Sequence, residues 1–95
     1  MALRGKKHDA GKRDWTLLPW VGLDPVLQVV EYGAAKYGRE NWRELPDAQR
    51  RYMAAAFRHL IAHARGVKND PESGLPHLAH CAVNVLFLLE TPEET

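Results

Sequence analysis

The sequence predicts an all-α protein in which three main helices form a bundle behind an extended N-terminal arm. Apolar residues recur at helical spacing in three separate stretches, and turn-forming residues separate these stretches. No stretch of useful length alternates between apolar and polar residues as a half-buried strand does. We therefore expect the 95 residues to form one domain, with residues 1–20 as the arm, 21–90 as the helical core and 91–95 as a tail.

Local signals define the arm and the first helix. The arm has no helical or strand period and ends in an apolar anchor that runs from Trp15 to Trp20. Asp24 is a suitable N-cap for the first helix, Pro25 suits its first position, and Gly38 suits the stop at its end. The core side of this helix is expected to consist of Val26, Leu27, Val29, Val30 and Ala34.

The second and third helices are separated by a connector, VKNDPESG, that is rich in turn formers. The second helix is expected to begin after Asp47 and to end at Gly66. The third is expected to run from about Pro76 to about Glu90. The core stripe of the second helix is expected to consist of Met53, Phe57, Leu60, Ile61 and Ala64.

Size and composition limit the classes of function. A domain of 95 residues has a core that is only marginally stabilising, so we expect helix pairing between copies to complete the bundle. The net charge of +1 argues against bulk attraction to nucleic acid. No segment is long and apolar enough to cross a membrane, and no signal peptide is visible. One cysteine, Cys81, fits a reducing compartment, so the expected location is the cytoplasm.

Histidines form the clearest polar pattern in the chain. His77, His80 and Asn84 stand at i, i+3 and i+7, which places them on one stripe of the third helix. The amide of Asn84 lies in an apolar run, where an unpartnered polar group costs about 1–3 kcal/mol, and the two imidazoles are its nearest candidate partners. His59 and His63 lie one turn apart on the second helix. Polar pairs on two helices are how bundles build metal or phosphate sites.

Carboxylates that could complete such a site are Glu31, on the first helix, and Asp70 and Glu72, in the connector. Imidazole ligands suit Zn, Mn, Co, Ni and Fe better than Mg. A single histidine on a helix flank is more often an ordinary surface or core residue than a ligand. The consistent spacing on two helices nevertheless favours a site.

Several blocks of the chain together resemble a known family. The blocks are D-A-G-K…W-x-L-L-P-W, Y-G-A-A-K-Y-G-x-x-N-W, R-H-L…A-x-x-x-G and D-P-E-S-G-L-P-H-L-A-H. They resemble the dATP/dGTP diphosphohydrolase N-terminal domain family, over about residues 7–89. That family looks like a branch of the MazG-like all-α pyrophosphohydrolases, which use a divalent metal to cleave nucleoside triphosphates to monophosphate and pyrophosphate. Those proteins form helical dimers or tetramers, so the resemblance implies a homodimer or homotetramer.

The resemblance to MazG-like proteins includes a departure in the metal ligands. Where those proteins have a glutamate and, four residues later, an aspartate before an apolar run, this chain has His80 and Asn84. His59 and His63 fall near their earlier glutamate cluster, in a register that is open by one residue. Fewer carboxylates weaken the binding of Mg. The metal is then a softer ion, the carboxylates come from elsewhere in the chain, or catalysis is lost.

The resemblance therefore implies metal-dependent hydrolysis of purine deoxynucleoside triphosphates, dGTP or dATP, in the cytoplasm (that of the host if a phage encodes the chain). The expected cofactor is Mn, Co or Mg, with Zn also possible. The alternative is a non-catalytic helical bundle that binds a nucleotide or a metal.

Each candidate residue has an expected role under this interpretation. The expected metal ligands are Glu31, Asp70, Glu72, His77, His80 and Asn84. The candidate general bases are Glu31, His59 and His63. The candidate phosphate cations are Lys12, Lys36 and Arg58. Trp15, Tyr37 and Trp42 are candidates to stack on the purine, with Asn41 reading its edge, although Trp15 fits equally well as an anchor for the arm.

Overall fold

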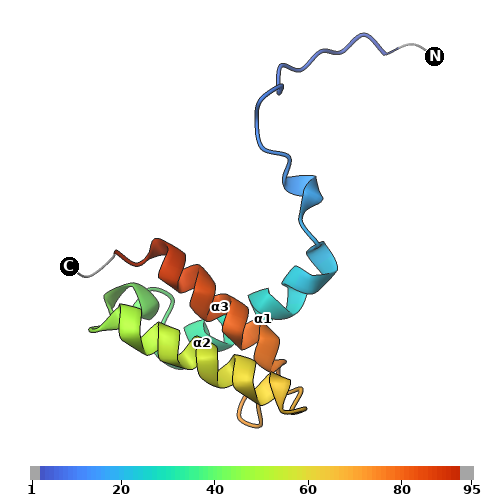
Figure 1. Cartoon of the computed structure of the whole chain (residues 1–95). Helices are drawn as coiled ribbons and strands as arrows, with labels where there is room; N and C mark the ends of the chain where they lie inside the picture. Colours follow the sequence, from blue (N-terminus) through green and yellow to red (C-terminus); the bar gives the residue numbers. More distant parts are fainter. Residues whose placement is uncertain (1–2, 93–95) are drawn as a thin grey trace.

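The computed structural model describes residues 3–92, and this part of the chain is all-helical (Figure 1). Its elements in order are η1 (Trp15–Leu17), α1 (Trp20–Tyr37), η2 (Asn41–Glu44), α2 (Ala48–Ala64) and α3 (His77–Glu90), where η denotes a 3₁₀ helix. Within the described residues there is no strand, only an isolated antiparallel bridge between Asn69 and Pro76. The predicted all-α fold with three main helices is confirmed. No helix in this range is long and apolar enough to cross a membrane.

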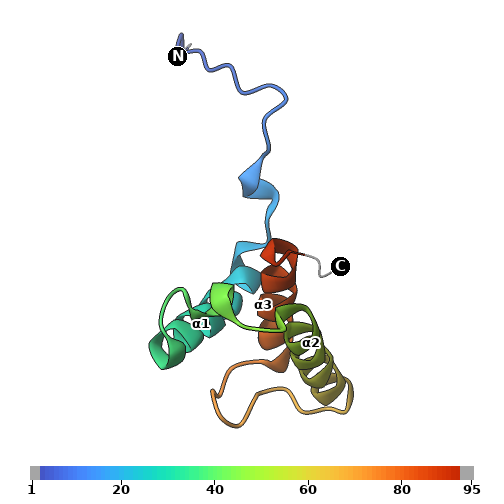
Figure 2. The same ribbon diagram turned by 90° about the vertical axis from the view of Figure 1, so that its left-hand side faces the viewer.

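The third helix joins the other two, because α3 packs against both α1 and α2. Figure 2 shows α1 and α2 on either side of α3. Val29 of α1 is buried against Ala79 and Val83 of α3. On the other side, the ring of Tyr52 in α2 contacts that of Phe87 in α3, with ring centroids 5.2 Å apart. The space between α1 and α2, beside α3, is therefore the natural place for a site.

The predicted start of the first helix is wrong. The helix begins at Trp20, so Pro19 is the N-cap and Pro25 lies inside the helix. Pro25 has no N–H to donate to the carbonyl of Val21, but Val21 is 90% exposed, so this end of α1 is open to water. Asp24 accepts a hydrogen bond from Gln28 Nε2 at 2.6 Å instead of capping the helix. The predicted stop is confirmed, since Gly38 follows the last turn with φ 95°.

The bounds of α2 and α3 agree with the prediction, but the predicted core faces do not. Toward α3, the second helix buries Ala48, Tyr52 and Ala56. The alanines let the two helices approach closely around Tyr52, and the other large apolar side chains of α2 face elsewhere. The predicted core stripe of α2 is exposed, by 43–56% for Met53, Phe57, Leu60 and Ile61, and Ala64 is exposed as well. On α1, Leu27 was also expected in the core and is exposed.

Residues 3–14 form no helix or strand and lead away from the three helices (Figures 1 and 2). Asp14 caps η1 by accepting a hydrogen bond from Thr16 N at 3.0 Å. The predicted apolar anchor does not pack against the helices, because Trp15 is 67% exposed and Trp20 is 57% exposed. Residues 1–2 of the predicted arm and 93–95 of the predicted tail lie outside the described residues.

Candidate functional site

Three histidines meet where the second half of α2 passes the first turn of α3. His59 of α2 lies between His77 and His80 of α3. The Nδ1 atoms of His59 and His77 are 2.8 Å apart. The rings of His59 and His80 are stacked, with centroids 4.5 Å apart and planes 13° apart. His77 is buried and the other two are half-buried. The helical spacing in the sequence thus brings three imidazoles into contact.

The loop between α2 and α3 adds a carboxylate to these imidazoles. Asp70 Oδ2 accepts a hydrogen bond from Ser73 N at 3.0 Å and lies 3.7 Å from His80 Nε2. Ser73 Oγ lies 2.7 Å from the same His80 nitrogen. The loop backbone is closed by Asp70 N donating to Leu75 O and by Gly74 N donating to Asp70 O, both at 2.8 Å. The carboxylate is therefore held in place by the loop's own hydrogen bonds.

Gly74 permits this loop because its φ is 74°, in the left-handed region that disfavours side chains. Replacing Gly74 with alanine is expected to lower the free energy of unfolding by about 1–2 kcal/mol, the cost of the left-handed conformation, since no neighbouring atom would clash with the added Cβ. Urea denaturation followed by circular dichroism measures the change. Gly22→Ala, in the first turn of α1, is the control and is expected to stabilise by up to about 1 kcal/mol. Equal stability of the two variants would contradict the prediction.

His59, Asp70 and His77 form a group that fits a metal ion. Each offers one ligand atom, and the three atoms lie within 4.8 Å of one another. Two imidazole nitrogens bound at about 2.1 Å to one ion are separated by roughly 3 Å at octahedral angles and by roughly 3.4 Å at tetrahedral angles. The observed separation of 2.8 Å between the two Nδ1 atoms is closer to the octahedral value. A hydrogen bond from one imidazole to the other accounts for the same distance without a metal.

The protonation states of the cluster suit ligation. Burial, helped by the charges of His80 and His77, lowers the pKa of His59 below its usual value. Burial also lowers the pKa of His80, although Asp70 opposes this effect. Burial alone would raise the pKa of Asp70, but the hydrogen bonds from Ser73 and the charges of His80 and His59 outweigh it, so this pKa is lowered. Neutral imidazoles beside an ionised carboxylate are the forms that bind metals.

A cavity of about 700 Å³ opens beside the cluster, between α1, η2, α2 and α3. Its lining contains more cations than carboxylates. The cations are Lys36, Arg39, Arg50, Arg51 and Arg58, and the carboxylates are Asp70 and Glu72. A concave surface with this excess of positive charge attracts and binds polyanions.

Some of these cations are engaged in ion pairs and others are available to bind an anion. Lys36 Nζ pairs with Glu72 Oε1 at 2.5 Å, which raises the pKa of Lys36 and lowers that of Glu72. Among residues 3–92, no carboxylate lies within ion-pair distance of Arg51, Arg58 or Arg39. These three guanidinium groups are the available anion ligands of the cavity, and guanidinium binds phosphate in a bidentate manner.

The aromatic side chains of the cavity differ in how much of the ring is free. The ring of Trp42 is stacked on Phe87, with centroids 4.4 Å apart and planes 5° apart. The guanidinium carbon of Arg43 lies 4.1 Å from the Trp42 ring centroid, so both faces of this ring are covered. Tyr37 is exposed, with Lys36 Nζ 5.1 Å from its ring centroid. Tyr37 is therefore the better placed of the two to stack on a ligand.

The structure gathers most of the predicted site residues around this cavity. Those that line it are Lys36, Tyr37, Asn41, Trp42, Arg58, His59, Asp70, Glu72, His80 and Asn84. His77 does not line the cavity, but it contacts His59, which does. The predicted partner of Asn84 was an imidazole, but its Nδ2 donates to the backbone oxygen of His80 at 2.8 Å.

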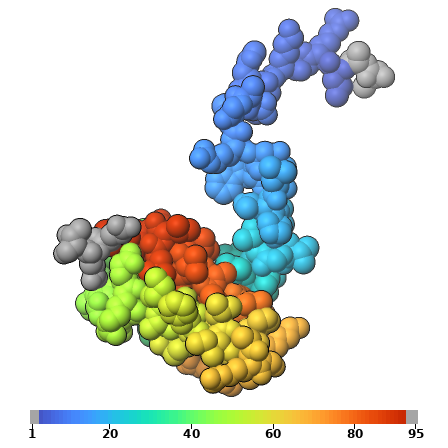
Figure 3. Space-filling view, in the orientation of Figure 1, coloured from blue at the N-terminus to red at the C-terminus, as the bar shows by residue number. Residues whose placement is uncertain are grey.

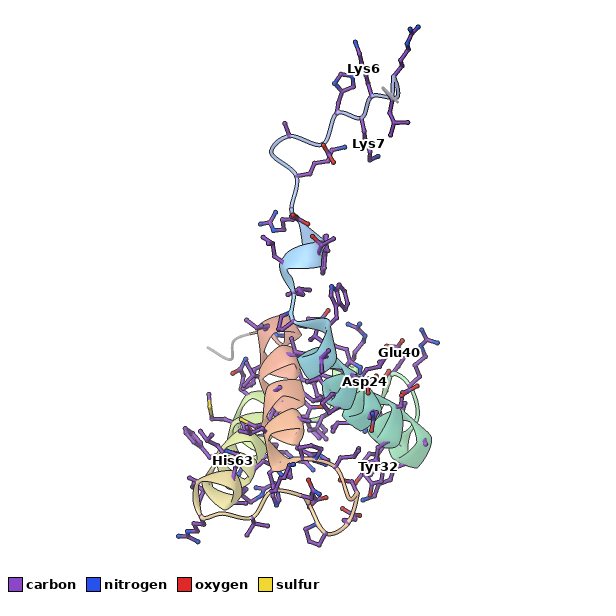
Figure 4. All side chains as sticks on the ribbon, turned by 90° about the vertical axis from the view of Figure 1, so that its right-hand side faces the viewer. Lys6, Lys7, Asp24, Tyr32, Glu40 and His63 are labelled. Atoms are coloured by element: carbon purple, nitrogen blue, oxygen red, sulfur yellow. The ribbon has the colours of Figure 1, made fainter. Side chains whose placement is uncertain are left out.

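Four predicted residues lie away from the cavity. Lys12 and Trp15 belong to the exposed N-terminal segment, which leads away from the helices. Glu31 and His63 are exposed on their helices and do not line the cavity. Figure 4 shows His63 across α3 from α1 and Tyr32. His63 lies one turn beyond His59, which itself contacts the first residue of α3, His77.

Sequence reasoning did not include three residues of this site. Arg50 and Arg51 line the cavity, and Ser73 contacts His80. Arg51 and Arg58 stand at i and i+7, so a helical-wheel comparison with His59 would have found Arg51. No local pattern distinguishes Ser73 from an ordinary turn residue.

Comparisons with known proteins assign the chain to a family. The family described as dATP/dGTP diphosphohydrolase, N-terminal, matches residues 3–95. A protein of Salmonella phage PMBT28 named dATP/dGTP diphosphohydrolase is 34% identical over 86 residues, which cover 90% of this chain and 29% of that protein. The chain thus spans less than a third of the length of this relative. No solved structure matches the chain.

Proposed function

Because this chain belongs to the dATP/dGTP diphosphohydrolase N-terminal family, we propose that it hydrolyses purine deoxynucleoside triphosphates to the monophosphate and pyrophosphate. One observation of the site carries this proposal. The cavity combines guanidinium groups that pair with no carboxylate of residues 3–92, those of Arg39, Arg51 and Arg58, with a cluster of histidines and an aspartate. A triphosphate needs cations along its chain and a metal-binding group near the phosphorus that is attacked.

The metal-binding residues in this proposal are His59, Asp70 and His77. A divalent ion held there would polarise a phosphate and lower the pKa of a bound water molecule. Two imidazoles and one carboxylate favour Mn, Fe, Co or Zn over Mg. The metal ligands would then differ from the carboxylates of MazG-like proteins, and the kinship with that group remains a prediction.

The remaining residues of the cavity have distinct roles. Arg51 and Arg58 bind phosphate oxygens, and Tyr37 and Asn41, which line the same cavity, contact the nucleoside. Burial keeps His80 neutral, and Ser73 Oγ, 2.7 Å from its Nε2, would accept a hydrogen bond from Nε2–H and so orient the ring. The other ring nitrogen, Nδ1, would then be the atom that accepts the proton of the attacking water. Of the three predicted general bases, His59 alone lines the cavity, and here it serves as a ligand.

A second candidate function is nucleotide binding without hydrolysis. The chain covers only 29% of the phage relative that carries the hydrolase name, so the residues that perform its chemistry need not lie in the shared part. A cavity rich in arginine would bind a triphosphate in either case.

Pyrophosphate release tests the proposal. Each common ribo- and deoxyribonucleoside triphosphate is incubated with the protein and with Mg, Mn, Co or Zn, one metal at a time. Turnover of dATP or dGTP that is faster with Mn or Co than with Mg is the expected result. Turnover with Mg alone would support the hydrolase activity but contradict the assignment of histidines as metal ligands. Tight binding of dATP or dGTP by calorimetry, with no pyrophosphate released under any metal, would replace hydrolysis by the second candidate.

A further inference from the structure

We propose that Glu72 pairs with Lys36 in the way that a phosphate group would, and that a triphosphate has to displace this carboxylate in order to bind Lys36. The competition makes the cavity selective for ligands that carry a chain of phosphates over ligands that carry one. This inference rests on the proposed function, since it concerns the substrate class of the same cavity. Both residues line the cavity, and neither has a role in the proposed mechanism.

The ion pair joins two walls of the cavity. Lys36 lies in the last turn of α1, and Glu72 lies in the connector between α2 and α3, 36 residues further along the chain. Lys36 Nζ donates a hydrogen bond to Glu72 Oε1 at 2.5 Å. A carboxylate and a phosphate offer the same kind of acceptor, an anionic oxygen, to an ammonium group. The two anions therefore compete for the same lysine.

Aromatic rings hold the ammonium group of Lys36 in place. Its Nζ lies 5.9 Å from the ring centroid of Tyr32 and 5.1 Å from that of Tyr37. A cation within about 6 Å of a ring centroid is attracted to the ring. Tyr32 lies on α1 near the connector, as Figure 4 shows. Because neither ring contact involves Glu72, we expect the ammonium group to stay where it is when the carboxylate leaves.

The ion pair is exposed enough to exchange. The side chain of Glu72 is 62% exposed and that of Lys36 is 38% exposed. An exposed ion pair adds little to stability, because water solvates both groups when the pair separates. Glu72 can therefore turn out to solvent at little cost. A ligand with several negative charges is able to take its place.

The other cations of the cavity explain why the length of the phosphate chain matters. Arg39, Arg51 and Arg58 pair with no carboxylate of residues 3–92, so a first phosphate binds them without displacing anything. A ligand with one phosphate is satisfied there. A triphosphate carries further phosphates, and these gain Lys36 only when Glu72 leaves it. The basic N-terminal segment does not supply a substitute, because it projects away from the helices (Figure 3).

The same competition favours release of the products. Hydrolysis converts one ligand that holds both the arginines and Lys36 into two shorter ligands. Each product engages fewer of these cations than the triphosphate does. Glu72 then competes for Lys36 again, and the ion pair forms once more.

Binding of inorganic triphosphate without metal tests the inference by calorimetry. Glu72→Gln keeps the size of the side chain and is expected to bind triphosphate about three- to five-fold more tightly, the contribution of an exposed ion pair. Its affinity for orthophosphate, measured by competition with triphosphate, is expected to change by less than about two-fold. Glu40→Gln is the matched control and is expected to change neither affinity. Glu40 also pairs with an arginine and is also 62% exposed, but it does not line the cavity.

A double variant separates competition for Lys36 from direct repulsion of phosphate. Lys36→Gln alone is expected to weaken triphosphate binding by about ten-fold. If Glu72 acts only by occupying Lys36, adding Glu72→Gln to Lys36→Gln restores no affinity. An equal gain from Glu72→Gln with and without Lys36 would mean direct repulsion and would overturn the proposal. No gain in Glu72→Gln alone, or an equal gain for orthophosphate, would also overturn it.

Pyrophosphate release by the wild type tests the proposed function separately. Turnover of dATP or dGTP, together with no gain of triphosphate affinity in Glu72→Gln, would reject the exchange at Lys36 and leave the hydrolase standing. The expected gain in a protein without turnover would reject hydrolysis and support the exchange.

Discussion

Replacing Asp70 with asparagine is expected to lower kcat for dATP or dGTP hydrolysis by about 100-fold or more, because removing an outer-shell partner of a metal site already costs about 10–100-fold. Asparagine keeps the size of the side chain and an oxygen that can accept from Ser73 N, so the loop is expected to stay in place. What the variant loses is the negative charge beside His59 and His77. Initial rates at saturating substrate and metal give kcat directly.

Two further measurements separate the loss of a ligand from a loss of structure. The far-ultraviolet circular dichroism of Asp70→Asn is expected to match that of the wild type, and its affinity for Mn is expected to fall with its activity. Asp24→Asn is the matched control, since Asp24 lies on α1, pairs with Gln28 and does not line the cavity. If Asp70→Asn kept the wild-type rate and the wild-type affinity for Mn, Asp70 would not be a metal ligand.

Local chemistry made the bounds of two helices predictable. The second helix starts after Asp47 and stops before Gly66, both of which have positive φ, and the third follows Pro76, because such turn residues interrupt a helix within a few positions. The same reasoning failed at Pro25, which looks like a first helical residue but lies inside α1. Pro25 leaves the carbonyl of Val21 without its intrahelical donor, which is tolerated where the residue is exposed, and exposure is not a local property of the sequence.

Periodicity predicted which residues share a helix face but not what that face contacts. The stripe that includes Phe57 and Ile61 is a true apolar face, yet within one copy α2 turns its alanines and Tyr52 toward α3. The competition between a close alanine contact and a larger apolar one depends on the shape of the neighbouring helix.

The site was predictable as far as it rests on helices. Spacing placed His77 and His80 on one stripe and His59 on another, and these three imidazoles meet. Spacing gave no reason to prefer His59 over His63, because the choice depends on where α3 begins relative to α2. The direction of Asp70 depends on hydrogen bonds within a turn, which composition alone does not determine.

Replacing Arg58 with alanine is expected to raise KM for dATP or dGTP by about 10–100-fold, because a hydrogen bond to a charged group contributes about 1.5–3 kcal/mol. Arg58 lines the cavity on the helix that carries His59, and no carboxylate of the described chain pairs with it. Its loss removes phosphate binding in the ground state and the transition state alike, so kcat is expected to change much less than KM. Steady-state kinetics over a range of substrate concentrations measures both constants.

Arg65→Ala is the control for Arg58→Ala, because Arg65 is exposed just after α2 and does not line the cavity. A normal KM for Arg58→Ala would place the triphosphate elsewhere. A fall in kcat as large as the rise in KM would instead give Arg58 a role specific to the transition state. We expect Asp70→Asn to lose kcat and Arg58→Ala to gain KM. Together these results would assign one part of the cavity to metal binding and another to phosphate binding, as the charges of the lining residues predict.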